Sequence, residues 1–424
     1  MKKLVIATII VILGVHTLSI AGAQEAMPPL ISRISVLGLK RTRARVPEKL
    51  LSRFLGTSVS DLDEETVITI LLETGIFEDI VVRTKESEVV SGEGGATIKA
   101  TLEVTVSEKW SIIPLPVFVA SSDGITAGAG LIDANAFGLN DKIFAIGLFL
   151  PDGWMTSLAY VNVPNSERDL RWSISGFFSS QDKTVVDQYE DSIRRYSSDA
   201  ARASFEIGFP LIRSVKYPLE ASVGAFFNEM GVREASSPLA QPEAGRVVGV
   251  KTGLSLRSSS WDGVFLSERQ ASLSWSYNYG LLNDSHQNLN FRSSYDYAPF
   301  PGLRLSLRGA AVYAPETPAV FEDGPFSIGN TILPTDFSAR NLAGFSAGLE
   351  GRIIKFPFGV LSGLLSYQVA FTEGPIIGTG FDHGPAGGVR VYVAKVAIPA
   401  LDAGAAYNVE TGIFKATFGI GMRM

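Results

Sequence analysis

Residues Gln270 to Tyr279, QASLSWSYNY, decide the fold class of this chain. Every second residue is apolar or aromatic, and the residues between them are polar. Successive side chains of a β-strand point to opposite faces, so this stretch predicts a strand with one apolar and one polar face. Trp275, Tyr277 and Tyr279 lie together at one end, a pattern typical of an aromatic belt at a membrane interface.

The same alternation continues from about residue 110 to the end of the chain, for example in 248–257, 303–313 and 414–424. Sixteen such segments start near residues 114, 124, 141, 155, 170, 201, 216, 247, 268, 288, 302, 344, 360, 387, 401 and 412. An even number of strands of about ten residues is typical of bacterial outer-membrane barrels. We therefore expect a mainly β protein with a sixteen-stranded antiparallel transmembrane β-barrel over residues 110–424. A soluble β protein, with its apolar faces turned inward, is the alternative.

The connections between these segments differ in length. Short ones fall at 135–140, 299–301 and 398–400, and long ones at 180–200, 228–246 and 314–343. Outer-membrane barrels have short periplasmic turns and longer outside loops. The lengths therefore predict that both ends of the barrel lie on the periplasmic side.

The N-terminus predicts export. Lys2 and Lys3 precede an apolar run, Leu4 to Ile20, and the small residues Ala21-Gly22-Ala23 match a signal-peptidase site. Residues 1–23 are therefore expected to be a signal peptide, with a retained membrane anchor as the alternative. The chain has no cysteine and a net charge of −6, so neither thiolate chemistry nor nucleic-acid binding is expected.

Residues 30–108 have an α+β pattern. Residues 31–36 alternate as a strand does, a helix is expected over 48–55 after Pro47, and Asp63 can cap a helix that runs to about Glu73. Two further strands are expected, over 79–85 and 98–106. The predicted order is strand, helix, helix, strand, strand.

Three motifs give this chain a family resemblance. Leu71-Leu72-Glu73-Thr74-Gly75-Ile76-Phe77-Glu78-Asp79-Ile80 and Val104-Thr105-Val106-Ser107-Glu108 are similar to the second helix and the closing strand of a POTRA domain. Asn135-Ala136-Phe137-Gly138-Leu139-Asn140-Asp141 resembles a first periplasmic turn, with Asn140 in place of a glycine. The chain thus resembles the BamA/TamA-type outer-membrane assembly and secretion family (bacterial surface antigen family). The resemblance implies a POTRA domain at 30–108 in the periplasm and a sixteen-stranded barrel in the outer membrane.

The resemblance also implies that the sixth outside loop folds back into the lumen and carries an arginine. Arg340, in Ala339-Arg340-Asn341-Leu342, is at that place in the strand order, and Phe371-Thr372-Glu373 is the nearest match to the family's acidic partner motif. An arginine can hold a carboxylate with a planar, permanently charged fork. We expect an Arg340–Glu373 pair in the lumen. Strand alternation places Glu373 in the lipid-facing phase, so the pair requires a bulge, and an exposed loop arginine is the alternative.

The barrel closes where its first segment meets its last. The residues expected at this seam are Pro114, Pro116, Phe118, Phe418 and Met424. The two prolines each lack a backbone donor and would weaken it. Such a seam could open sideways, as the resemblance implies for client insertion. Alternatively, both prolines lie in the linker before the strand.

The resemblance implies non-enzymatic handling of proteins. The expected partners are β-rich clients, bound by strand addition at an edge formed by Ile80, Val81, Val82 and Arg83, with outer-membrane lipids and accessory periplasmic proteins as further partners. His286 and His383 offer no catalytic or metal constellation, and no cofactor motif is present. The expected function is insertion or translocation of β-rich proteins, and the alternative is a passive pore or binding barrel of the same fold.

Overall fold

A computed structural model describes residues 28–92, 95–121, 124–163, 170–212, 218–235, 242–261, 265–357, 359–393 and 399–420. The chain forms two compact units, Met1–Lys109 and Trp110–Met424. The expected signal peptide lies outside the described residues.

The N-terminal unit has the expected order of elements. They are β1 (Leu30–Leu37), α2 (Arg45–Leu50), the 3-10 turns η1 (Ser52–Phe54) and η2 (Val59–Asp61), α3 (Glu64–Glu73), β2 (Phe77–Gly92) and β3 (Gly95–Glu108). The first helix is shorter than expected, because the chain turns into η1 after Leu51. The sheet order is β1-β3-β2, with β1 parallel and β2 antiparallel to β3.

Helix α3 begins where the sequence predicts. Asp63 lies at its N-cap and accepts hydrogen bonds from the Glu65 amide and the Thr66 hydroxyl, which satisfies donors that the first helical turn leaves free. Val67 and Leu71, four residues apart, are fully buried against the sheet. The helix therefore closes one face of the three-stranded sheet over a single apolar core.

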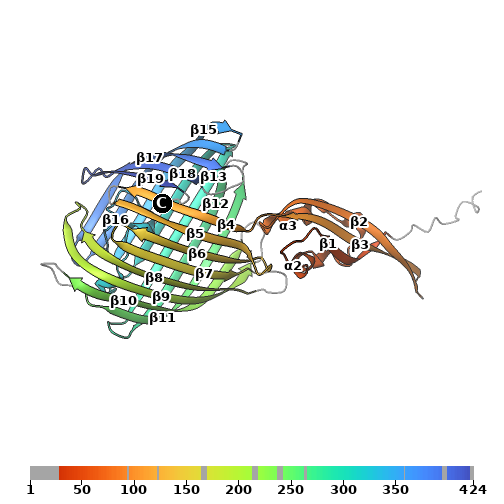
Figure 1. Cartoon of the computed structure of the whole chain (residues 1–424), viewed down its shortest axis with the longest axis horizontal. Helices are drawn as coiled ribbons and strands as arrows, with labels where there is room; N and C mark the ends of the chain where they lie inside the picture. Colours follow the sequence, from red (N-terminus) through yellow and green to blue (C-terminus); the bar gives the residue numbers. More distant parts are fainter. Residues whose placement is uncertain are drawn as a thin grey trace, which may run out of the picture. The chain divides into compact units, whose positions relative to one another are not determined.

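The second unit is a closed antiparallel barrel of sixteen strands, β4 to β19 (Figure 1). The strands are β4 (Ile112–Ser121), β5 (Gly124–Ala136), β6 (Asp141–Leu150), β7 (Gly153–Asn162), β8 (Arg171–Val186), β9 (Ser192–Ile212), β10 (Leu219–Ala235), β11 (Gly245–Trp261), β12 (Leu266–Gly280), β13 (His286–Phe300), β14 (Leu303–Tyr313), β15 (Asn341–Phe356), β16 (Gly359–Gly374), β17 (Gly378–Val393), β18 (Pro399–Tyr407) and β19 (Phe414–Ile420). The predicted fold class is confirmed, and each of the sixteen predicted segments corresponds to one strand.

Two of the three long loops were predicted wrongly. Most of 180–200 and of 228–246 is strand, because β8, β9 and β10 continue their pairing beyond the predicted ends. Strand β17 likewise begins at Gly378 rather than near 387. Its glycines and Pro385 hide the strand pattern in the sequence, but the ladder with β16 holds this segment extended from end to end.

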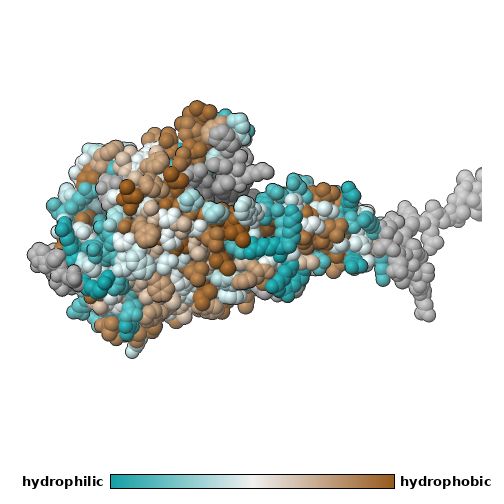
Figure 2. Space-filling view, viewed as in Figure 1, coloured by the Kyte–Doolittle hydropathy of each residue, from teal (hydrophilic) through white to brown (hydrophobic). Residues whose placement is uncertain are grey.

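The two faces of the barrel differ as the alternation predicts. Leu273, Trp275, Tyr277 and Tyr279 are exposed on the outside, while Ser276 and Asn278 of the same strand are buried inside. Figure 2 shows hydrophobic residues spread over the outer wall of the barrel. No helix among the described residues is long and apolar enough to cross a membrane.

Candidate functional site

The longest connection of the barrel, residues 314–340 between β14 and β15, fills part of the lumen; we call it the plug. It contains the 3-10 turns η3 (Ala319–Phe321) and η4 (Pro325–Ile328). Its buried side chains include Val320, Ile332, Leu333 and Phe337. A connection this long that nevertheless has a buried core of its own is typically functional.

The plug contacts strands all around the lumen. The Thr331 amide donates to Gln368 on β16 (2.9 Å), and Lys415 on β19 donates to the Leu333 carbonyl (3.3 Å). Thr317 donates to Asn288 on β13. On the other side of the barrel, the Val186 amide of β8 donates to the Asp336 carbonyl, and Val320 packs against Ala200 of β9 and Met230 of β10. Bonds to walls on opposite sides of the barrel hold the plug across the lumen.

Arg340 stabilises the plug from within. Its guanidinium lies 3.6 Å from the carboxylate of Glu322 and donates to the Pro315 carbonyl (3.0 Å). Ser338 donates to the same carboxylate (3.2 Å), and residues 323 and 339 form a short antiparallel bridge. These contacts tie the end of the plug back to its middle.

The expected Arg340–Glu373 pair is replaced by a different one. Glu373 is exposed on the outer face of β16 and accepts a hydrogen bond from Asn341 (3.0 Å). Asn341 faces Glu373 in the regular ladder, and this end of β16 has no bulge that would turn Glu373 inward. Arg340 therefore takes Glu322 as its carboxylate. That partner lies within the loop, where strand periodicity carries no information.

The plug carries two carboxyl groups whose pKa values are shifted upward. Burial raises the pKa of Glu322, although the Ser338 hydrogen bond and the charges of Arg194 and Arg340 oppose this shift. Burial also raises the pKa of Asp323, against the opposing charges of Arg202 and Arg292 on the barrel wall. The docked plug thus binds protons more readily than a released, solvated plug would.

A cluster of buried charged residues lies on strands β13 to β18, at the ends of these strands that are away from the plug. Glu350 on β15 accepts hydrogen bonds from Arg304 of β14, Ser362 of β16 (2.7 Å), and Arg390 (3.2 Å) and Tyr392 (2.9 Å) of β17. Asp402 of β18 and Asp296 of β13 extend this cluster through Arg390 and Arg304. We call it the ionic cluster, and it connects the six strands from β13 to β18.

The ionic cluster is dry. Glu350 is 1 % exposed, and Arg304 and Arg390 are 4 % and 5 % exposed. Phe265 covers it, with its ring 5.1 Å from the Arg304 guanidinium and edge-on to Tyr392. The alternation places Arg304 on the polar face, but no pattern in the sequence brings Arg304 and Arg390 to Glu350.

The seam between β19 and β4 completes the barrel. Among the described residues, its ladder runs over four pairs, from Thr417↔Ser121 to Ile420↔Phe118. Pro114 and Pro116 lie inside β4, opposite Leu131 and Ala129 of β5, and not in a linker before it. Residues two apart in a strand direct their N–H groups to the same side, so both prolines remove donors from the same neighbour. Met424 lies outside the described residues.

The register of the seam separates its two phenylalanines. Phe418 faces Ala120, and Phe118 faces Ile420, so Phe118 and Phe418 are not direct partners. Both phenylalanines are exposed on the outer face. A cross-link across the seam therefore belongs at Ala120 and Phe418.

The expected client edge lies on β2 of the N-terminal unit. β2 pairs with β3 on one side, and among the described residues no strand pairs with its other side. Ile80 and Val82 pack on the core, while Val81 and Arg83 are exposed. An unpaired edge with alternating side chains is what strand addition requires.

Three solved structures resemble this fold over nearly all of its length. CdiB from Acinetobacter baumannii has a TM-score of 0.64 at 14 % identity, covering 93 % of this chain and 74 % of its own. CdiB from Escherichia coli has a TM-score of 0.67 at 12 % identity, covering 93 % and 76 %. BamA from Haemophilus ducreyi lacking POTRA domains 1–3 has a TM-score of 0.58 at 13 % identity, covering 92 % and 84 %.

No protein-family model and no curated protein sequence matches this chain. The likeness to the solved structures therefore concerns the fold: a small α/β unit followed by a closed sixteen-stranded barrel. That is the fold expected from the sequence motifs.

Proposed function

We propose that this chain, which has the fold of the BamA/TamA-type family, is an outer-membrane protein that assists insertion or translocation of β-rich client proteins. In this proposal the N-terminal unit is a POTRA domain in the periplasm that receives the client. The plug holds the resting lumen closed, and the seam between β19 and β4 parts to let the client enter the membrane.

The observation that carries the proposal is the construction of the seam. Among the described residues, β4 and β19 share four ladder pairs, and β4 also contains two prolines that lack a donor, whereas β13 to β18, on the other side of β19, are held together by the ionic cluster. A closed sheet that must open will part where its hydrogen bonding is weakest. The contrast between these two walls supports opening at β4.

The N-terminal unit supports the first step. The free edge of β2 offers main-chain donors and acceptors, which can bind a client strand without strict demands on its sequence. We also propose that the protein acts without catalysis. His286 lies against Phe321 of the plug, and His383 lies against Tyr367 and Glu410. The two histidines therefore lie in separate places and do not form a catalytic pair with each other.

A disulfide across the seam tests the proposal. The natural chain has no cysteine, so Ala120→Cys with Phe418→Cys introduces one defined pair. We expect the oxidised protein to lose delivery of outer-membrane proteins after depletion of the natural chain, and reduction to restore it. The matched control is Ala225→Cys with Val250→Cys, a directly paired position in the continuous ladder of β10 and β11.

Oxidised control protein should keep full function. Undiminished delivery by the oxidised seam variant, with cross-linking complete, would exclude a laterally opening seam. A passive pore of the same fold would then be favoured, and it would show unchanged outer-membrane protein levels on depletion.

A further inference from the structure

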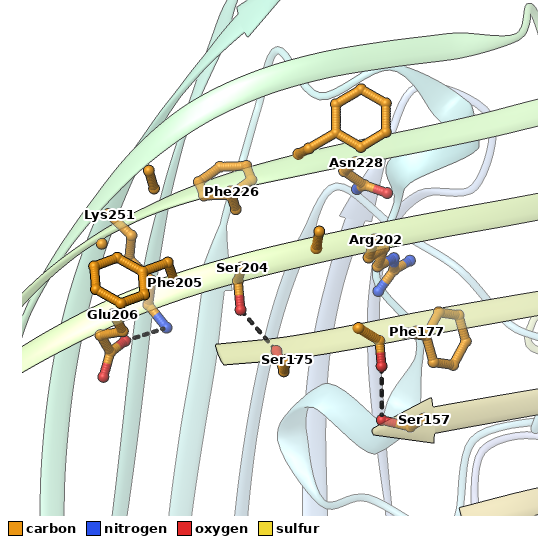
Figure 3. Close-up of a pocket in the computed structure, with 15 residues that line it drawn as sticks. Ser157, Ser175, Phe177, Arg202, Ser204, Phe205, Glu206, Phe226, Asn228 and Lys251 are labelled. Atoms are coloured by element: carbon orange, nitrogen blue, oxygen red, sulfur yellow. Dashed lines mark hydrogen bonds and ion pairs between the residues drawn. The ribbon is translucent and has the colours of Figure 1, made fainter. Parts of the chain in front are cut away.

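The lumen wall formed by β7 to β11 contains a hollow of about 370 Å³ beside the plug (Figure 3). We call it the wall pocket. Its side chains that face the lumen are Ser157, Ser175, Phe177, Arg202, Ser204, Glu206, Phe226, Asn228 and Lys251. The volume is in the range of small-ligand sites, which combine apolar faces with a few placed polar groups.

Strand register arranges these side chains in rows. Ser157, Phe177, Arg202 and Asn228 face one another in sequence across β7 to β10. The next row holds Ser175, Ser204, Phe226 and Gly249, and the third ends at Glu206 and Lys251. At Gly249 an added Cβ would lie 2.3 Å from the Phe226 ring, so glycine lets this ring lie against the wall and leaves the hollow open.

Several polar groups in the first row have unused bonding capacity. Arg202 is exposed to the lumen, lies 5.4 Å from the centre of the Phe177 ring, and makes no hydrogen bond to any residue that the structure describes. The side-chain oxygen of Asn228 is buried and accepts no hydrogen bond within the described part of the chain. A buried amide oxygen without a donor is unusual in a folded protein. A ligand that carries acceptor oxygens would satisfy the guanidinium of Arg202, which is open to the lumen.

The wall offers no free strand edge. Each of β7 to β11 is paired with a neighbour on both sides. A peptide therefore cannot bind here by strand addition and would depend on side-chain contacts alone. Serine hydroxyls can donate or accept, and phenyl rings offer flat apolar faces. A sugar ring presents the matching chemistry, with hydroxyls around its rim and apolar C–H faces.

The plug already places a carboxylate near the pocket. Asp323 interacts electrostatically with Arg202, and Phe177 packs against the cluster that contains Val320 of the plug. Arg202 and Phe177, both in the first row of the wall pocket, therefore interact with the plug as well as line the pocket.

We propose that the wall pocket binds a saccharide unit that carries a carboxylate, with the carboxylate on Arg202 and the ring between Phe177 and Phe226. The ligand's carboxylate takes the place of Asp323, so occupancy loosens the plug. This site goes beyond the proposed handling of client proteins and does not depend on it, because its test measures binding to the purified chain.

The test is calorimetric binding of cellobiouronic acid, a disaccharide with one glucuronic acid, to the purified full chain in detergent micelles. Neutral cellobiose is the matched ligand control. We expect Arg202→Gln to weaken binding about tenfold or more, because it removes a charge-assisted hydrogen bond. Asp323→Asn, which removes the competing carboxylate and leaves the barrel wall unchanged, should strengthen binding. Arg257→Gln, a lumen-side arginine of β11 outside the pocket, should have no effect.

Each other outcome overturns the proposal. Equal binding of cellobiose would show that the carboxylate is not recognised, and equal losses in Arg202→Gln and Arg257→Gln would place the ligand elsewhere. Binding of a tetraglutamate peptide as tightly as the disaccharide would assign the pocket to acidic peptides instead. Unchanged binding by Asp323→Asn would refute competition with the plug.

Discussion

Replacing Glu350 by alanine should be among the most destabilising single changes in the barrel. Glu350 is 1 % exposed, and the substitution leaves Arg304 and Arg390 buried without their shared carboxylate. Removing one partner from a buried ion pair costs about 3–5 kcal/mol, chiefly because the remaining charge stays desolvated. Asp296 and Asp402 still contact these arginines, so we expect a loss of about 3 kcal/mol.

The measurement is the free energy of unfolding in urea, with the protein reconstituted in lipid vesicles. Glu373→Ala is the matched control, since Glu373 is also a strand carboxylate but is exposed and bonds to Asn341. It should cost about 1 kcal/mol or less. A second variant, Arg304→Met with Glu350→Leu and Arg390→Met, removes the two buried arginines together with their shared carboxylate and should recover part of the loss, because Asp296 keeps its contact with Arg308 and only the less buried Asp402 loses a partner.

Two results would refute this reasoning. If Glu350→Ala and Glu373→Ala unfold with the same free energy, the ionic cluster contributes nothing beyond a surface interaction. If the triple variant is as unstable as Glu350→Ala, then lost packing, and not unpaired charge, explains the effect.

Three further predictions concern the plug and the client edge. Arg340→Ala should raise single-channel conductance in planar bilayers, because it removes the contact with Glu322 and loosens the plug. The control Arg257→Ala should leave the conductance unchanged. Equal conductance of the two variants would show that the Arg340–Glu322 contact does not hold the plug. Because burial raises the pKa of Glu322 and Asp323 in the docked plug, docking is most favourable below their usual pKa values of 4.5 and 3.8 and weakens as pH rises through the raised values. Channel openings should therefore become more frequent from acidic to neutral pH, and Glu322→Gln with Asp323→Asn should flatten this dependence. Neighbouring residues of a strand direct their N–H groups to opposite sides, so Val81→Pro and Val82→Pro remove donors from different sides of β2. One of the two substitutions should reduce cross-linking of a client peptide to the full chain while the N-terminal unit stays folded, and the other should unfold that unit. Normal cross-linking in both variants would exclude the β2 edge as the client site.

Much of the candidate site could not be predicted from the sequence. The sequence predicts Glu373 as the carboxylate of Arg340, but in the structure Arg340 lies beside Glu322. Glu322 lies in an irregular loop, and no periodic pattern indicates where such a side chain points. Glu350 and Arg390 are forty residues apart in the chain, and only the closing of the sheet brings them within hydrogen-bonding distance.

The alternation of polar and apolar residues by itself determined the two-faced strands, because a strand with one face toward lipid and one toward water must repeat every two residues. The cap at Asp63 and the period of Val67 and Leu71 likewise determined helix α3 from local interactions. Only the tertiary structure decided where the plug lies, which charges share the dry ionic cluster, and which residues meet at the seam. Those contacts join segments far apart in the chain, and their geometry depends on strand register and closure, which no local pattern encodes.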